Sequence, residues 1–323
     1  MMRYSLIALL ALLALIAAPP AVSQSTGGDS FVTLGTMGGP VANPKRSQPA
    51  NLLLRGKDAY LVDCGDGAVQ QMGKAGVLLP QVRAVFLSHL HVDHTGGLAA
   101  LLGLRNQTEI RSVLTVYGPP GTKALVDGIV ASMAPAAKAG YGYPGQSWAD
   151  PASIVTVVEF GDDARVSIDG MTVTAVQNTH YDFPRGSAED TAYKSLSLRF
   201  DLPDRSIVYT GDTGPSTAVE RLAKGADLLV SEMIDVEGTL GVVRHNAPNM
   251  PPPAQQKLIR HLTMHHLTPG DVAALAQRAG VKAVAITHFS AGPDNPERTA
   301  RDLATIAQTY AGPVRIANDL DRF

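Results

Sequence analysis

The chain has 323 residues, a formal net charge of −2 at pH 7 and 17% charged residues. This composition excludes a highly charged disordered chain, and it lacks the excess of lysine and arginine that is typical of nucleic-acid-binding proteins. The only cysteine, Cys64, excludes an intramolecular disulfide. We therefore expect one large globular domain that is stabilised by its hydrophobic core and does not bind nucleic acid.

The N-terminus has the pattern of a secretory signal peptide. Arg3 precedes an apolar run over residues 6–18, which is followed by proline and small residues. We expect residues 1–23 to be removed, and residues 24–323 to form a mature domain that is periplasmic or secreted. The alternative is an uncleaved anchor. The apolar run is shorter than the ~20 residues that span a bilayer, so no stable membrane anchor is expected.

Strand and helix patterns alternate along the mature chain, which predicts an α/β fold. Short apolar runs predict strands near 31–36, 50–55, 58–63, 83–88, 154–160, 165–168 and 171–177, two strands within 195–210, one at 227–231 and a last strand-helix unit over 282–310. Helical patterns are found near 67–76, 119–131 and 271–279, and from about residue 216.

Two segments interrupt this regular alternation. Residues 134–151 are rich in alanine, glycine, tyrosine and proline, and we expect an exposed loop near the mouth of the site. Residues 235–266 include three consecutive prolines and are too long for an ordinary connection. We expect this second segment to be irregular and to form part of a lid or wall.

The most informative segment reads HLHVDH over residues 89–94 and follows the strand predicted at 83–88. Four metal-capable side chains lie within six residues, on a turn that leads into a helical pattern. Imidazole and carboxylate groups are typical zinc ligands, and this spacing fits two metal ions better than one. A chance histidine cluster on a solvated loop is the alternative.

Three further polar residues, His180, Asp212 and His288, each close another strand-like run. Ligands gather at the C-terminal ends of strands in α/β proteins, so we expect these side chains to join the first cluster. Taken singly, Asp212 could instead be a helix N-cap, and the two histidines could be buried residues with ordinary hydrogen bonds. Three such endings in one chain favour a shared site.

The ordered set of motifs resembles the metallo-β-lactamase superfamily: HxHxDH with TGGL, a distant histidine, a GDT aspartate and a late THF histidine. The resemblance extends from residue 33 to about residue 316. The LGTMGGP loop at 34–40, LVDCGDG at 61–67 and HLTP at 266–269 are most similar to the tRNase Z and type III arylsulfatase branch. The resemblance implies a four-layer αβ/βα sandwich, the metallo-β-lactamase fold.

The resemblance also implies a ligand set for two zinc ions. His89, His91 and His180 would bind the first ion, Asp93, His94 and His288 the second, and Asp212 would bridge them. A hydroxide bridging the ions would attack the substrate. Asp93 and Asp63 would also be catalytic residues. Asp63 would orient a ligand imidazole, unless it only forms the turn in DCGDG.

The resemblance implies that His266 completes the site, because the matching histidine of the tRNase Z-like branch serves as proton donor or oxyanion partner, and we expect a proton donor. It precedes a predicted helix with Thr268 as N-cap and Gly280 just beyond its end. The alternatives are a solvated loop histidine, or a donor role for its neighbour His265. His245 and His261 are expected to be surface residues.

The expected substrate is a small ester, and the expected enzyme is a secreted zinc hydrolase of the arylsulfatase type. The alternatives are a phosphodiesterase like tRNase Z, a β-lactam or lactone hydrolase, and a metal-binding protein without turnover. A diiron redox relative would usually carry glutamate at the position of His91. A homodimer is left open.

Two features bear on substrate contacts. Arg46 could pair with a sulfate or phosphate oxygen, or be an exposed loop charge. Tyr141, Tyr143 and Trp148 could form an aromatic rim for the substrate, or an ordinary packed loop.

Overall fold

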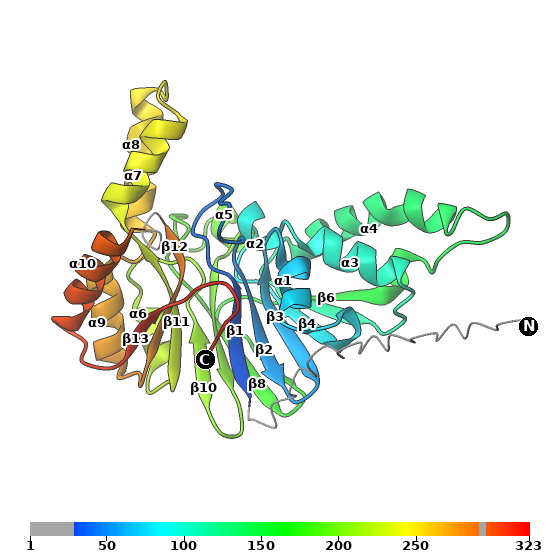
Figure 1. Cartoon of the computed structure of the whole chain (residues 1–323), viewed down its shortest axis with the longest axis horizontal. Helices are drawn as coiled ribbons and strands as arrows, with labels where there is room; N and C mark the ends of the chain where they lie inside the picture. Colours follow the sequence, from blue (N-terminus) through cyan, green and yellow to red (C-terminus); the bar gives the residue numbers. More distant parts are fainter. Residues whose placement is uncertain (1–28, 291–294) are drawn as a thin grey trace, which may run out of the picture.

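The computed structural model of the chain describes residues 29–290 and 295–323, so the expected signal peptide and cleavage site lie outside the described residues. The described residues form two seven-stranded sheets that pack face to face, and helices cover both outer faces (Figure 1). The predicted four-layer αβ/βα sandwich is therefore confirmed.

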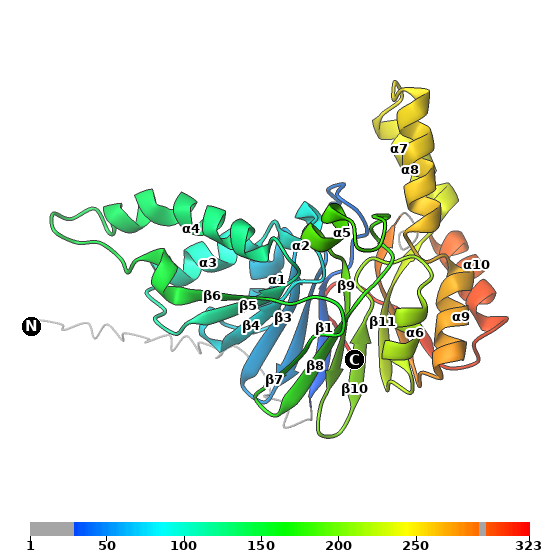
Figure 2. The same cartoon turned by 180° about the vertical axis from the view of Figure 1, so that it is seen from behind.

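The first sheet comes mostly from the N-terminal half of the chain and has the order β14-β1-β2-β3-β4-β5-β6. Its strands are β1 (Ser30–Gly35), β2 (Ala50–Arg55), β3 (Asp58–Cys64), β4 (Val82–Phe86), β5 (Leu114–Gly118), β6 (Val155–Glu159) and β14 (Asp321–Arg322). The helices on this side, seen in Figure 2, are α1 (Ala68–Lys74), α2 (Val92–Thr95), α3 (Leu98–Gln107) and α4 (Thr122–Ala139).

The second sheet comes from the C-terminal half and has the order β13-β12-β11-β10-β9-β8-β7. Its strands are β7 (Arg165–Ile168), β8 (Met171–Gln177), β9 (Leu196–Asp201), β10 (Ser206–Tyr209), β11 (Leu228–Ile234), β12 (Val284–Ser290) and β13 (Val314–Ile316). The helices of this half are α5 (Ala188–Ala192), α6 (Thr217–Ala223), α7 (Val236–Asn246), α8 (Pro252–Met264), α9 (Pro269–Ala279) and α10 (Pro296–Ala307).

Alternating side chains of the central strands build the core between the sheets. In β3, Tyr60 and Val62 belong to the cluster between the sheets, whereas Leu61 belongs to the cluster under the outer helices. Phe86 of the first sheet contacts Phe200 of the second with ring centroids 5.5 Å apart. Strands that are buried on both faces read as continuous apolar runs, which is why the sequence located them well.

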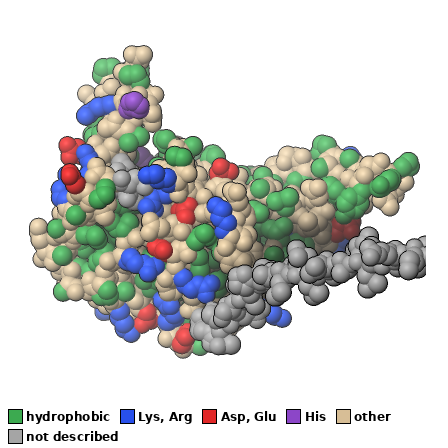
Figure 3. Space-filling view, in the orientation of Figure 1, with side chains coloured by type: hydrophobic (Ala, Val, Ile, Leu, Met, Phe, Trp, Pro, Cys, Tyr) green, Lys and Arg blue, Asp and Glu red, His purple; other side chains and the backbone are tan. Residues whose placement is uncertain are grey.

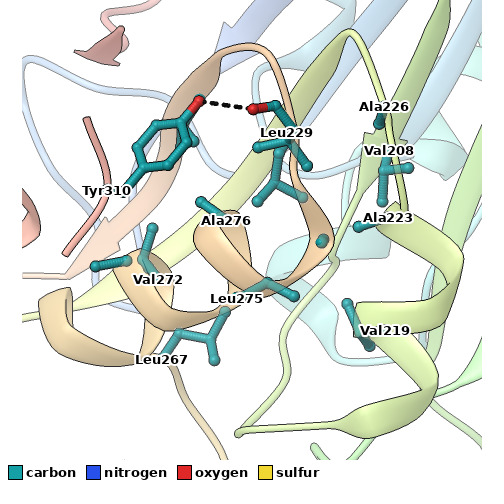
Figure 4. Close-up of a cluster of buried hydrophobic side chains, with 14 of the residues drawn as sticks. Val208, Val219, Ala223, Ala226, Leu229, Leu267, Val272, Leu275, Ala276 and Tyr310 are labelled. Atoms are coloured by element: carbon teal, nitrogen blue, oxygen red, sulfur yellow. Dashed lines mark hydrogen bonds between the residues drawn. The ribbon is translucent and has the colours of Figure 1, made fainter. Parts of the chain in front are cut away.

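A second apolar layer joins α6 and α9 to the outer face of the second sheet (Figure 4). Val219 of α6 and Leu275 of α9 are buried in this layer together with Leu229 of β11. The hydroxyl of Tyr310 donates a hydrogen bond to the carbonyl of Val281 at 3.0 Å. Each large apolar side chain buried here contributes about 1.5–3 kcal/mol, so the layer holds β11 and β12 firmly in place.

The strands that matter for function end at the same edge of the sandwich. β3 and β4 are parallel neighbours in the first sheet. In the second sheet β10, β11 and β12 are parallel, and β8 has the same direction because β9 is antiparallel to both of its neighbours. The edge where these strands end lies near α2 and α5 in Figure 1.

The segment expected as a loop over 134–151 differs from the structure. α4 continues to Ala139 through Pro135, and the remaining loop lies at the far end of α4, away from α2 and α8 (Figure 1). Tyr141 and Trp148 pack on each other there, with ring centroids 5.6 Å apart. The loop is therefore not near the mouth of the site, because the helix carries it outward, and of the two alternatives for these rings the structure supports the packed loop.

The segment expected to be irregular over 235–266 was also mispredicted. It forms α7 and α8, two packed helices that stand out from the body of the molecule (Figure 1). Asp235 caps α7 by accepting a hydrogen bond from the N–H of Gly238. The proline run begins α8, where proline is tolerated because first-turn N–H groups have no helical partner. No helix in the described ranges is long and apolar enough to cross a membrane.

Candidate metal centre

Seven metal-capable side chains converge at the edge where these strands end. They come from the loop after β4, from α2, from the segments after β8 and β10, and from β12. The residues are His89, His91, Asp93, His94, His180, Asp212 and His288. Six of them are buried, and His91 is the exposed member of the set. The structure thus brings together every residue that the sequence singled out as a ligand.

Three of the imidazole rings are held through Nδ1, which leaves Nε2 directed at the cluster. The pairs are His89 with Ser88 Oγ at 3.0 Å, His94 with Asp63 Oδ2 at 2.8 Å, and His180 with the carbonyl oxygen of His265 at 3.2 Å. A neutral ring that donates from Nδ1 presents a lone pair on Nε2, the form that binds a metal ion.

Asp63 lies beneath the cluster at the end of β3 and is fully buried. Its carboxylate accepts hydrogen bonds from the N–H and hydroxyl of Ser88, from Nδ1 of His94 and from the hydroxyl of Tyr209, at 2.7–2.8 Å. A residue that only formed a turn would not need these partners. The contacts fit the orienting role that the resemblance implies for Asp63.

The first group of ligand atoms has the spacing of a tetrahedral metal site. Nδ1 of His91 lies 3.1 Å from Nε2 of His89 and 3.2 Å from Nε2 of His180. Nitrogen atoms placed 2.0–2.1 Å from a tetrahedral zinc ion lie about 3.3 Å apart. These three nitrogens therefore fit one ion.

Asp212 stands between the first group and the second. Nε2 of His94 lies 3.7 Å from Oδ2 of Asp93, and so does Nε2 of His288. One carboxylate oxygen of Asp212 lies 3.3 Å from His94 Nε2, and the other lies 3.3 Å from His288 Nε2 and 3.8 Å from His180 Nε2. A carboxylate in this position can bind an ion in each group.

The electrostatics of the cluster differ between its two groups of ligands. Burial lowers the pKa of His89 and His180 well below the ordinary value, so both rings are neutral. Burial disfavours the charged form of Asp212, but His288 and His94 outweigh it and hold the pKa of this carboxyl well below its usual range. Burial would lower the pKa of His94 and His288, but the Asp212 carboxylate outweighs it and favours their protonated forms. Ligand imidazoles must be neutral, so a cation bound here would displace these protons and take over their role beside Asp212.

Buried atoms without hydrogen-bond partners point the same way. Within residues 29–290 and 295–323, His94 Nε2, His288 Nδ1 and Asp212 Oδ1 have none. A buried polar atom without a partner costs about 1–3 kcal/mol, and a bound ion would remove this cost for the first and last of these atoms. The residues present therefore fit a divalent metal.

His266 lies beside the cluster and is held there by a residue that sequence reasoning missed. Its Nδ1 lies 2.7 Å from Oε2 of Glu232, which is buried in β11. Burial alone would lower the pKa of His266, but the Glu232 carboxylate outweighs this effect and raises the pKa to about 9. The second oxygen of Glu232 accepts a hydrogen bond from the N–H of Thr213. The sequence did contain a signal for this residue, because Glu232 is a single carboxylate inside the apolar run 228–234.

The other histidines of the segment 235–266 lie in different positions. The ring of His265 turns toward the carbonyl oxygen of Thr179, at 2.7 Å from Nδ1, so His266 and not His265 faces the centre. His261 was expected on the surface, but it is half-buried and its ring lies 5.1 Å from that of His180. Burial, with the neighbouring histidines, lowers the pKa of His261 to about 4. His245 is exposed on α7, as expected.

Arg46 is held within the fold by hydrogen bonds and is not a free loop charge. Its guanidinium donates hydrogen bonds to Thr36 Oγ1, the carbonyl oxygen of Ala317 and Asn318 Oδ1 at 2.7–3.0 Å. These bonds tie the segment after the GGP motif to the C-terminal part of the chain. The same loop reaches the centre through Gly39, whose N–H lies 3.3 Å from His288 Nε2.

Sequence and structure place the chain in a known class. A family model described as "Beta-lactamase superfamily domain" matches residues 59–289. The structure resembles the metallo-β-lactamase fold protein YhfI from Bacillus subtilis, with a TM-score of 0.65 and 18% identity over 92% of this chain and 99% of that one. The chain therefore belongs to the metallo-β-lactamase superfamily, and it is a metal-dependent hydrolase of ester-type bonds.

Its relatives define the branch. The chain is 31% identical over 301 residues to the ribonuclease Z of Mycolicibacterium paratuberculosis, covering 90% of this chain and 96% of that protein. It is 28% identical to a ribonuclease Z of Mycobacterium bovis with the same coverage. The short form of human tRNase Z has the same fold, with a TM-score of 0.59 and 21% identity over 91% of this chain and 98% of that one. The chain belongs to the tRNase Z branch.

This similarity overturns two expectations drawn from the sequence. Relatives named ribonuclease Z argue against a small-ester, arylsulfatase-like substrate and against the exclusion of nucleic acid. The charge argument failed because net charge averages the whole chain, whereas an RNA contact depends on the few cations beside the site. The motifs could not distinguish a tRNase Z from a type III arylsulfatase, because the same ligand pattern was used to recognise both.

Proposed function

We propose that the chain is a dinuclear zinc phosphodiesterase that cleaves RNA. The observation that carries this proposal is the ligand cluster bridged by Asp212, with the His266–Glu232 pair directly beside it. The relatives named ribonuclease Z supply the substrate class. Two bound divalent ions would provide Lewis acidity and a nucleophile derived from water at neutral pH.

The protein side chains would bind the two ions and orient their ligands. His89, His91 and His180 would hold one ion, Asp93, His94 and His288 the other, and Asp212 would touch both. Asp63 fixes the ring of His94 and so sets the position of the second group. Such orienting partners commonly change metal affinity or activity by roughly 10–100-fold when they are removed.

His266 would donate a proton to the leaving oxygen. Its Nδ1 is occupied by Glu232, so Nε2 is the atom available for this transfer. Glu232 holds the ring in one orientation and favours its protonated form, as a proton donor requires. The leaving alcohol of an RNA phosphodiester is a poor leaving group, and it therefore gains most from protonation.

Hydrolysis by metal-loaded protein tests the proposal directly. Protein with close to two zinc equivalents should hydrolyse an RNA with a 3′ extension and bis(4-nitrophenyl) phosphate, and should leave 4-nitrophenyl sulfate intact. Treatment with a chelator should abolish both phosphodiesterase activities, and added zinc should restore them. Turnover of the sulfate ester without turnover of either phosphodiester would overturn the proposed function.

We also propose that residues 1–23 direct export, on the basis of the charged start and apolar run described above. Export would separate the enzyme from cytoplasmic RNA, so its substrate would be RNA outside the cytoplasm. Cell fractionation of the full chain and of a variant without residues 1–23 tests this point. Equal cytoplasmic retention of both would contradict export.

A further inference from the structure

A pocket of about 410 Å³ opens directly beside the metal centre. His91 and His180 form its inner end, the loop 181–183 forms one side, and α8 forms the other. Pockets for small ligands typically have volumes of roughly 300–1,000 Å³, so this one is large enough for a single nucleotide. The residues of the outer walls, in the loop 181–183 and in α8, have no proposed role in binding the metal ions.

The loop side of the pocket is aromatic. Tyr181 lies against the ligand histidines, with its ring centroid 5.4 Å from that of His91. Phe183 follows at 5.7 Å from Tyr181, and Tyr193 at 6.1 Å from Phe183. Phe183 and Tyr193 are exposed. The three rings thus form a track that leads outward from the metal centre.

The helix side of the pocket carries two cations, Lys257 and Arg260, and the neutral ring of His261. Lys257, Arg260 and His261 occupy positions i, i+3 and i+4 of α8, so they share one face of the helix, and all three line the pocket. Arg260 forms an ion pair with Asp182 at 3.0 Å, which offsets the only carboxylate in the lining. In the described part of the chain no carboxylate pairs with Lys257, so its charge is available to a ligand.

Aromatic rings that face cations are the arrangement with which proteins bind single-stranded nucleic acid without reading its sequence. We propose that this pocket binds a nucleotide adjacent to the scissile phosphate, with its base on Phe183 and Tyr181 and a phosphate near Lys257 and Arg260. This inference rests on the proposed function and names the part of the RNA that the site holds. An unpaired nucleotide is required, because a paired base could not reach the rings.

Binding to zinc-loaded protein tests the subsite without turnover. By calorimetry, uridine 5′-monophosphate should bind at least roughly tenfold more tightly than inorganic phosphate, and more tightly than uridine, because only the nucleotide uses both walls. Phe183→Leu should weaken nucleotide binding at least roughly fivefold, at the lower end of the effect of losing a stacked base. Lys257→Ala should weaken it and reduce its salt dependence.

Matched substitutions in α4 and in the loop that follows it provide the controls. Tyr143→Leu and Lys138→Ala remove an exposed aromatic ring and an exposed lysine far from the pocket, and both should leave nucleotide binding unchanged. Phosphate binding as tight as nucleotide binding would overturn the proposal, because the base would then contribute nothing. So would equal effects of Phe183→Leu and Tyr143→Leu.

Kinetics separates this inference from the proposed function. Thymidine 5′-(4-nitrophenyl) phosphate carries a nucleoside where methyl 4-nitrophenyl phosphate carries only a methyl group. The ratio of their kcat/KM values should fall in Phe183→Leu and Lys257→Ala, and an unchanged ratio would overturn the subsite. If the wild-type protein binds the nucleotide but hydrolyses no phosphodiester, the proposed function is wrong and the nucleotide subsite is still supported.

Discussion

The metal centre and the α8 side of the neighbouring pocket lie next to each other but are built in opposite ways. Six of the seven ligands are buried, and hydrogen bonds such as that between His94 and Asp63 hold several of the rings in place. The α8 side presents long exposed side chains from a helix that stands outside the sandwich (Figure 1). The chemistry thus depends on rigid positions, and substrate binding on adaptable ones.

The bridging position should show the largest effect. Asp212→Ala would remove the carboxylate that lies within 3.9 Å of both ligand groups, so zinc content should fall below two equivalents and the rate by several orders of magnitude. Metal analysis and phosphodiesterase assays would measure both. A variant with wild-type zinc content and rate would contradict the ligand assignment.

His266 should give the next largest effect. His266→Ala should keep its zinc and lower kcat by roughly 10²–10⁴, the usual contribution of a general acid. The loss should be larger for RNA than for a 4-nitrophenyl ester, whose leaving group needs no proton. An equal loss on both substrates would indicate that His266 only shapes the pocket.

Glu232 should matter less than the histidine that it holds. Glu232→Gln should lower kcat by roughly 10–100-fold with zinc retained. The carboxylate raises the pKa of His266, so its removal should move the basic limb of the pH–rate profile to lower pH, because the ring loses its proton earlier. An unchanged limb would show that Glu232 has only a packing role.

The stability of α7 and α8 should depend on Asp235, which lies at the start of α7. Asp235 caps α7 and pairs with Arg298 at 2.6 Å. Asp235→Ala should destabilise α7 by about 1 kcal/mol or more, whereas Asp235→Asn keeps the cap and should cost less. Hydrogen exchange should then speed up in α7 and α8 but not in the β strands. Faster exchange throughout would contradict the view that the two regions are independent.

The smallest effect should be the salt dependence of RNA binding. On the face shown in Figure 3, lysine and arginine side chains are scattered among acidic and apolar ones rather than forming one basic stripe. If Lys257 and Arg260 make the main phosphate contacts, the slope of log K against log salt should be about −1.4, from −0.7 for each cation. A slope several times steeper would reveal a basic surface elsewhere.

The contrast between the two regions also explains what the sequence could predict. The ligand set was readable because short spacings and strand ends determine where His89 and Asp212 point. Glu232 was missed because its partner lies 34 residues away in the chain, and only the packed sheet brings them together. The segment 235–266 was expected to form part of a wall, and α8 does line the pocket. Its helical form was missed because a proline run resembles a loop, although prolines can also begin a helix.

At the metal centre, two residues that carry functional side chains have a strained backbone. Asp63 and His288 have φ values of 57° and 43°, in the left-handed region that non-glycine residues seldom adopt. Each such residue costs about 1–3 kcal/mol, which the packed strands around it must offset. At these two positions the function of the side chain therefore outweighs the preference of the backbone. Glycine at either position would ease the backbone while removing a functional side chain, so selection for stability alone would tend to erode this edge.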